Sequence, residues 1–216
     1  MNNYTINYNY FNTEQIKFLE KKQYEGITKI GLSYYHNQAF RNYITLPTPW
    51  MFIPFGLGKY QNKNNDSKYY LDLSFSGIKK DLYLQQFHNI IEKLDKYVIY
   101  KTQTNLENLE IQHLLQKKNL SKYYTYSLRY NINKETLKKE TKYPPTIKLK
   151  LFTSNLQIID TDGNQLDSIN HLKRGVFIKT DIRCNGMWVL KNKFGLTWTA
   201  KHIIVSNHKM NNYYNI

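Results

Sequence analysis

The chain has 216 residues, of which 31 are lysine or arginine and 16 are aspartate or glutamate, so its formal net charge is +15. This charge favours a polyanionic partner, with nucleic acid as the first candidate and an anionic membrane as the second. The single cysteine, Cys184, excludes an internal disulfide and a cysteine-based zinc site. There is no apolar run of about 18 residues and no secretory leader pattern, so we expect no membrane-spanning segment and a reducing intracellular compartment.

Aromatic residues are frequent, with 20 tyrosines and 10 phenylalanines in an otherwise polar sequence. A basic protein rich in aromatic residues suits unstacked bases better than a duplex backbone, because every base can stack on a ring. An AT-rich genome supplies a competing explanation, since it would raise the content of asparagine, lysine, tyrosine and isoleucine.

The order of the elements predicts a single domain at residues 13–207, between a flexible arm at residues 1–12 and a short polar tail at residues 208–216. The arm is largely asparagine and tyrosine, with little that can pack. After a short helical signal from Thr13, the pattern at residues 27–35 predicts the first strand.

The next part of the chain is predicted to form an edge strand or ordered loop, followed by a hairpin. Residues 45–58 are apolar but hold three prolines, which restrict them to an edge strand or an ordered loop. The polar run at residues 59–68 predicts an exposed hairpin tip. Alternation at residues 69–75 predicts a strand that buries Leu71 and Leu73 on one face.

Two amphipathic helices are predicted next. Helical spacing of apolar residues follows an N-cap at Asp81, and the buried stripe includes Phe87 and Leu94. A second helix is predicted at residues 106–118, with Asn105 as its cap. Both helices are expected to support the sheet rather than to carry chemistry.

Strand alternation returns in the second half of the chain. Residues 122–131 predict a strand with an aromatic face. Residues 146–152 predict a strand in which Lys148 and Lys150 face away from the apolar residues. This alternation gives one cationic strand face.

Residues 175–205 hold the densest mixture of strand signals, turn signals, cations and aromatic residues. We predict a three-stranded meander here, with a tight turn at Asn185-Gly186 and another at residues 191–193. Alternation places Lys179 and Arg183 on the face opposite the apolar residues of the first of these strands. A second cationic face results.

Cations beside aromatic rings can bind a single-stranded nucleic acid, because phosphates meet the cations while bases stack on the rings. The predicted nucleic-acid-binding residues are Lys148, Lys150, Lys179, Arg183, Trp188, Lys191, Lys193, Trp198 and Lys201, with Arg129, Tyr130, Lys59 and Tyr60 as second-rank candidates. For each tryptophan, a place in the core of a small barrel is the competing interpretation. We predict no catalytic residue, no metal and no cofactor.

Three other functions stay open. A metal nuclease would use the Asp-x-Asp pair of Asp160 and Asp162 to hold magnesium, although Asp162-Gly163 favours a simple hairpin turn. An RNA-binding module would need contacts to the 2′-hydroxyl. A structural interaction protein would use the aromatic and basic surface as a partner interface. Replication proteins and self-association also stay open as partners, and a membrane is not expected.

Several pieces of the chain resemble a known family when taken in order. They are Thr48-Pro49, the Pro54-Phe55-Gly56 turn, YYLDLSF at residues 69–75, PPTIKLKL at residues 144–151 and GMWVLKNKFGLTWTAKHIIV at residues 186–205. Their order resembles the single-stranded-DNA-binding proteins of nucleocytoplasmic large DNA viruses, which are similar in turn to phage replication proteins built on an OB-fold. The last piece is the most specific.

The resemblance implies a mainly β, α+β fold with two helices: an OB-fold-like five-stranded barrel with insertions. It also implies a non-catalytic protein that coats and protects displaced single strands of a viral-type genome during replication, recombination or repair. OB barrels bind oligonucleotides across a strand face and adjoining loops, in agreement with the cationic strand faces. The expected location is the host cytoplasm, in a viral factory or on a cytoplasmic genetic element. Relatives of the phage type end in an acidic, aromatic tail that recruits partners, whereas this chain ends in asparagine, tyrosine and lysine.

Overall fold

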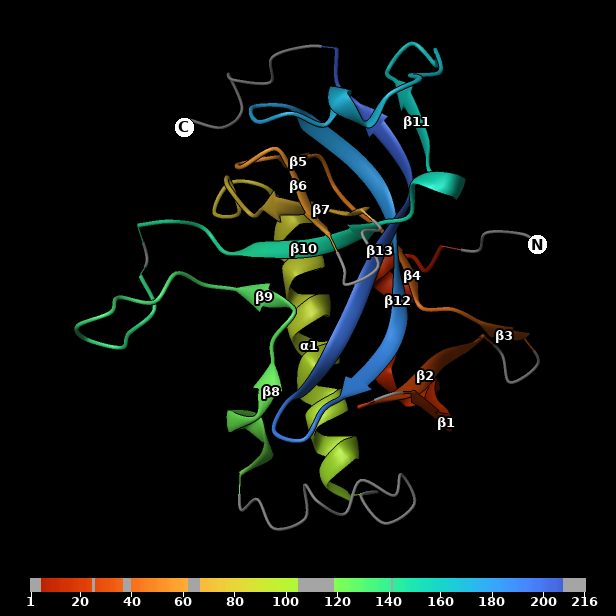
Figure 1. The fold of residues 1–216 in the computed structure, drawn as a ribbon, viewed down its shortest axis with the longest axis vertical. Helices are drawn as coiled ribbons and strands as arrows, with labels where there is room; N and C mark the ends of the chain where they lie inside the picture. The colour runs from red at the N-terminus through yellow and green to blue at the C-terminus, as the bar shows by residue number, and fades with distance from the viewer. Residues whose placement is uncertain are drawn as a thin grey trace.

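The protein is mainly β and is built around one α-helix in the described part of the chain (Figure 1). In the computed structural model the described residues are 5–24, 26–36, 40–61, 67–104, 119–140 and 142–207. The helix α1 is Leu82–Thr104, and short 3-10 turns lie at Tyr8–Tyr10, Thr13–Gln15, Leu120–Lys122, Thr153–Asn155 and Ile169–His171. The strands are β1 Ile16–Tyr24, β2 Ile27–His36, β3 Phe40–Asn42, β4 Thr45–Pro47, β5 Met51–Phe52, β6 Leu57–Gln61, β7 Ser67–Ser74, β8 Tyr124–Thr125, β9 Leu128–Arg129, β10 Thr146–Leu151, β11 Gln157–Asp160, β12 Phe177–Val189 and β13 Phe194–Val205.

Hydrogen-bonded pairing joins five of the strands in a closed circuit. β12 pairs with β5, β5 with β7, β7 with β10, β10 with β13, and β13 returns to β12. The link through β5 is short, because β5 and β7 share the single residue pair Phe52↔Ser74. Since the sheet joins thirteen strands in the described ranges, the predicted five-stranded OB-type barrel is not confirmed as such.

β12 and β13 form one long antiparallel hairpin through the centre of the sheet (Figure 1). Its turn lies at residues 190–193, where the Leu190 N–H donates to the Lys193 carbonyl at 2.8 Å. The predicted meander is therefore wrong, because Asn185-Gly186 does not reverse the chain but forms a bulge within β12. Gly186 has a φ of 96°, and a Cβ there would lie 2.4 Å from the Ile30 carbonyl oxygen on β2. Glycine is needed at this close approach of two strands.

Alternation predicted three strands correctly and a fourth incorrectly. The strands predicted at residues 27–35, 69–75 and 146–152 are confirmed as β2, β7 and β10. The single strand predicted at residues 122–131 is instead two short strands, β8 and β9, which pair with different neighbours. A continuous aromatic face does not form there.

The first part of the chain is packed against the sheet. Ile6 and Phe11 are buried, and the Ile6 N–H donates to the Thr45 carbonyl at 2.8 Å. The Tyr8 hydroxyl donates to the Pro47 carbonyl. Residues 5–12, which were expected to be part of a flexible arm, are therefore docked by both core and polar contacts.

Helix α1 packs against the inward-facing residues of the central strands. Its buried residues are Leu84, Phe87, Ile90, Ile91, Leu94, Asp95, Val98 and Thr102. The Asp81 carboxylate accepts a hydrogen bond from the Leu84 N–H at 3.0 Å, which confirms the predicted N-cap. The second predicted helix, at residues 106–118, lies outside the described residues. No helix in the described ranges is long and apolar enough to cross a membrane.

A buried polar network ties α1 to the sheet. Asp95 on α1 is 1% exposed and accepts hydrogen bonds from the Tyr124 hydroxyl at 2.6 Å and from the N–H and hydroxyl of Ser127, both at 2.8 Å. The Ser127 hydroxyl in turn accepts from the Nε1–H of Trp198 on β13 at 2.9 Å. Because these groups are all buried, each relies on its neighbours to satisfy its polar atoms.

Asp95 makes the stability of the fold depend on pH. Burial raises its pKa to about 6 from an ordinary 3.8, although hydrogen bonds from Tyr124 and Ser127 lower it. The folded protein therefore holds this proton more tightly than the unfolded chain. The free energy of unfolding is expected to fall as the pH rises from about 4 to about 6, and to stay level above that. The difference of about two pKa units corresponds to about 3 kcal/mol.

Asp95→Asn is expected to remove this part of the pH dependence. Urea denaturation of both proteins between about pH 4 and pH 7 measures the effect. Subtracting the variant from the wild type cancels the contributions of Asp72 and Asp181, whose raised pKa values are common to both proteins. Parallel stability curves across this range would contradict the prediction.

Candidate nucleic-acid interface

One face of the sheet, named the outer face from here on, carries cations and aromatic rings on neighbouring strands. Its residues are Lys29 on β2, Lys68, Tyr70 and Asp72 on β7, Lys148 and Lys150 on β10, Lys179, Arg183 and Trp188 on β12, and Lys201 on β13, with Tyr43 and Trp50 beside them. They alternate along their strands with buried residues such as Leu71, Leu149 and Ile182. Period-2 geometry therefore directs them away from the core.

A row of four residues crosses the outer face in register. Tyr70 on β7 pairs with Lys150 on β10, and Lys150 pairs with Thr199 on β13. Thr199 pairs in turn with Arg183 on β12. Neighbouring strands lie about 4.8 Å apart, so the row spans about 14 Å. A nucleic-acid strand that crosses the sheet here would meet one ring and two cations.

Two lysines from other strands lie near Lys150. Lys29 comes from β2 and Lys68 from β7, and both lie close enough to repel the Lys150 ammonium on β10. The main cause that lowers the pKa of Lys150 is desolvation, and repulsion from the two other lysines lowers the pKa further. A bound anion would relieve this repulsion. The convergence thus indicates a place for phosphate groups.

Aromatic rings lie under several of the cations of the outer face. The pairs are Lys148 with Tyr70 at 3.7 Å, Arg183 with Tyr43 at 4.4 Å, Lys29 with Tyr24 at 4.5 Å and Lys179 with Trp50 at 5.4 Å, each measured from the cation to the ring centroid. Cation–π contacts of this kind hold rings and cations side by side at the surface. A base and its neighbouring phosphate can then be bound together.

Trp188 lies half-buried on the outer face. It is paired with Lys29 on β2 and with Gly195 on β13. A Cβ on Gly195 would lie 3.1 Å from the Trp188 ring, so the glycine leaves room for the indole to lie across β13. The indole N–H donates to the Leu196 carbonyl at 3.3 Å. The ring is thus held in place beside a cation, with part of its surface open to solvent.

The other first-rank lysines divide between the outer face and the hairpin turn. Lys201 lies in a bulge of β13, where desolvation and then repulsion from Arg183 lower its pKa. Lys191 and Lys193 are exposed at the turn between β12 and β13 rather than on the outer face.

Trp198 was predicted to stack on bases, and the structure contradicts this. It is 2% exposed, and it pairs in register with the fully buried Cys184. Its indole N–H is already used by Ser127. The competing interpretation, a tryptophan of the core, is correct for Trp198.

The second-rank candidates are also divided by the sheet. Tyr60 is paired with Lys68 and shares the side of Tyr70, whereas Lys59 is paired with Tyr69 and lies on the opposite side. The Tyr130 ring is covered by the Lys139 ammonium at 3.8 Å from its centroid. The Tyr130 hydroxyl also lies 3.0 Å from Nε2 of His88 on α1, and Lys59 does not belong to the outer face.

Six residues of the outer face were missed by sequence reasoning: Lys29, Tyr43, Trp50, Lys68, Tyr70 and Asp72. Tyr70 could have been found, because it alternates with Leu71 in a strand that was predicted correctly. Lys29 carried no such signal. Its place depends on the pairing of β2 with β12, which joins residues far apart in the sequence.

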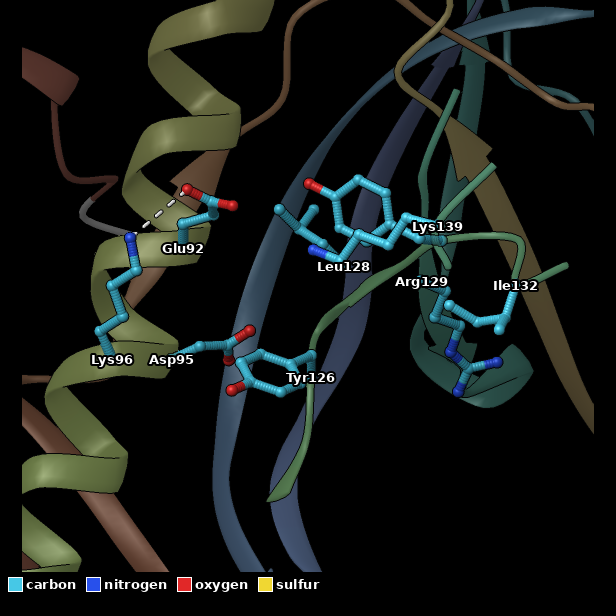
Figure 2. Close-up of a pocket in the computed structure, with 9 residues that line it drawn as sticks. Glu92, Asp95, Lys96, Tyr126, Leu128, Arg129, Ile132 and Lys139 are labelled. Carbon is cyan, nitrogen blue, oxygen red and sulfur yellow. Dashed lines mark ion pairs between the residues drawn. The ribbon is translucent and has the colours of Figure 1, made fainter. Parts of the chain in front are cut away.

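A pocket of about 670 Å³ opens between α1 and the segment that carries β8 and β9 (Figure 2). It is lined by Glu92, Asp95, Lys96, Tyr126, Leu128, Arg129, Tyr130, Ile132 and Lys139. Glu92 and Lys96 form an ion pair at 3.7 Å on α1. Arg129 lines the pocket and also reaches Asp72, so the pocket adjoins the outer face at this residue. Charges of both signs line it, and we assign no ligand to it.

Hydrogen bonds to the Asp160 carboxylate stabilise the turn after β11. Asp160 accepts hydrogen bonds from the N–H groups of Asp162 and Asn164 at 2.9 and 2.8 Å. The side-chain amide of Asn164 contributes most to lowering the pKa of Asp160. Gly163 has a φ of 87°, which fits the predicted turn. Among the described residues, no group of three or more His, Cys, Asp or Glu side chains is placed to hold a metal ion.

The fold and the outer face together define a mainly β protein with a cationic, aromatic surface on one side of its sheet. No protein-family model matches the chain, and no curated protein matches its sequence. Its fold is similar to that of a single-stranded DNA-binding protein from bacteriophage Enc34, solved as a C-terminal truncation, with a TM-score of 0.48 and 10% identity over 89% of this chain and 96% of that one. It is also similar to gp2.5, a single-stranded DNA-binding protein encoded by bacteriophage T7, with a TM-score of 0.47 and 11% identity over 75% of this chain and 91% of that one. Membership of the viral family that the sequence resembles stays a prediction.

Proposed function

We propose that the protein binds single-stranded DNA on its outer face, without catalysis. The observation that carries this proposal is the row of Tyr70, Lys150, Thr199 and Arg183 that crosses the sheet in register, on a face that also holds the partly exposed ring of Trp188. The cations would neutralise phosphates, and the ring would stack on a base. Neither contact depends on the identity of the base, so we expect binding that is independent of the nucleic-acid sequence.

The rings of the outer face favour a single strand over a duplex. A duplex keeps its bases stacked inside and offers mainly phosphates, whereas a single strand can turn its bases toward Trp188 and Tyr70. In the cell such a protein would coat and protect displaced strands during replication, recombination or repair. A viral-type genome in the host cytoplasm is the setting that the sequence resemblance implies.

Tryptophan fluorescence tests this function directly. Oligo-thymidine is expected to quench the fluorescence, and Trp188→Phe is expected to reduce the quenching, because the rings of Trp188 and Trp50 on the outer face are partly exposed while that of Trp198 is buried. Trp198→Phe is the matched control and should keep the quenching. If Lys29, Lys68, Lys150 and Arg183 each meet a phosphate, the slope of log affinity against log salt between about 50 and 200 mM should be about −3.

Three outcomes would redirect the proposal. Equal affinity for a duplex of the same length, or the absence of quenching, would contradict binding through stacked bases. Tighter binding of oligo-uridine than of oligo-thymidine would assign the face to RNA instead.

A further inference from the structure

A carboxylate lies among the cations of the outer face. Asp72 on β7 pairs in register with Lys148 on β10, and its side chain is 13% exposed. It is flanked on its own strand by the buried residues Leu71 and Leu73, so it points to the same side as Tyr70. A surface that binds polyanions would be expected to exclude such a group, because it repels phosphates.

Each oxygen of Asp72 faces a different cation. Oδ2 lies 3.7 Å from Nζ of Lys148, and Oδ1 lies 4.0 Å from a guanidinium nitrogen of Arg129. The Lys148 ammonium also lies 3.7 Å from the ring centroid of Tyr70. Two cations around two oxygens are the arrangement that a phosphate group of a nucleic acid would adopt at the same place.

The two ion pairs are loose rather than tight. Both distances exceed those of charge-assisted hydrogen bonds, which lie at about 2.7–2.9 Å. Desolvation raises the pKa of Asp72 more than Lys148 and Arg129 lower it, so the two cations do not fully compensate its buried charge. Cations held in this way can be transferred to a competing anion at little cost.

We propose that Asp72 is an internal competitor for phosphate: it occupies Lys148 and Arg129 in the free protein and weakens the binding of a single strand to the outer face. The inference rests on the proposed function of that face. When a strand binds, its phosphates displace the carboxylate from the two cations. Binding through phosphates alone is penalised in this way, so a strand that also stacks on the rings is favoured over other polyanions.

Removing the charge of Asp72 tests the inference. Asp72→Asn is expected to bind oligo-thymidine about threefold to tenfold more tightly than the wild type, because Lys148 and Arg129 become free for phosphates. The salt slope should steepen by about 0.7 for each cation released. Fluorescence anisotropy with a labelled strand measures both quantities. Asp72→Ser is a second variant that removes the same charge, should Asp72→Asn fold poorly.

Two controls separate competition from a general change of charge. Glu92→Gln also removes an acid from a 3.7 Å pair with a lysine, Lys96, but on α1 rather than on the outer face. It should leave the affinity unchanged. In a Lys148→Gln background, the gain from Asp72→Asn should become smaller, because one of the two competing cations is gone.

The outcomes distinguish this inference from the function on which it rests. Tighter binding and a steeper salt slope for Asp72→Asn, with no gain for Glu92→Gln, support it. Equal or weaker binding of both Asp72 variants, when the wild type binds oligo-thymidine, overturns the inference and leaves the proposed function intact. If the wild type itself does not bind, the proposed function fails and the inference fails with it.

Discussion

Oligo-thymidine is expected to bind the Lys150→Glu variant about ten to a hundred times more weakly than it binds the wild type. Lys150 lies in the in-register row between Tyr70 and Thr199, and Lys29 and Lys68 converge on it. A glutamate there would repel the phosphate that the lysine attracts and would pair with the two remaining lysines. The plot of log affinity against log salt should therefore become shallower by at least 0.7, which is the contribution of about one phosphate contact.

Lys93→Glu is the matched control for this prediction. Lys93 is exposed on α1, outside the outer face, so the variant has the same net charge as Lys150→Glu. Anisotropy titrations of the three proteins at the same salt concentration make the comparison. Losses of equal size in both variants would show that the overall charge, rather than this face, holds the strand.

Side-chain alternation is the part of the candidate site that the sequence predicts well. Lys148 and Lys150 alternate with buried leucine and isoleucine, and Lys179 and Arg183 follow the same rule on β12. The rule is local, because successive residues of any strand point to opposite faces. It needs no knowledge of which strands are neighbours.

Pairing and register are the part that the sequence could not predict. The Asn185-Gly186 dipeptide is the usual signal for a tight turn, yet here the glycine lets β12 pass close to Ile30 of β2. The convergence of Lys29 with Lys150 likewise depends on strands that are distant in the sequence. A local pattern cannot distinguish a turn from a bulge when the reason for the glycine lies on another strand.

Trp188 and Trp198, on the neighbouring strands β12 and β13, also show that the sequence alone does not predict register. Both tryptophans stand near lysines in the sequence, and both were predicted to stack on bases. The bulge at Asn185-Gly186 and the register of β12 with β13 place one on the outer face and the other in the core. The two rings therefore predict opposite results in one experiment.

Trp198→Ala is expected to lower the free energy of unfolding by about 3 to 5 kcal/mol, the usual cost of removing a buried aromatic side chain. The ring is 2% exposed, and its loss would leave a cavity in the core. It would also remove the hydrogen bond to Ser127, whose hydroxyl donates to the buried Asp95 carboxylate. Urea denaturation followed by circular dichroism measures the change without relying on tryptophan fluorescence.

Trp188→Ala is expected to have the opposite effects, with a small loss of stability and a clear loss of affinity. Its ring is half-buried and makes one hydrogen bond to a backbone carbonyl, so the expected cost is only about 1 kcal/mol. Its affinity for oligo-thymidine should fall by roughly tenfold, since one stacked base is worth about 1 to 3 kcal/mol. The Trp198→Ala protein, studied at a temperature where it stays folded, should keep its affinity. Exchanged roles, with Trp198 needed for binding and Trp188 for stability, would mean that the faces of β12 and β13 are assigned the wrong way round.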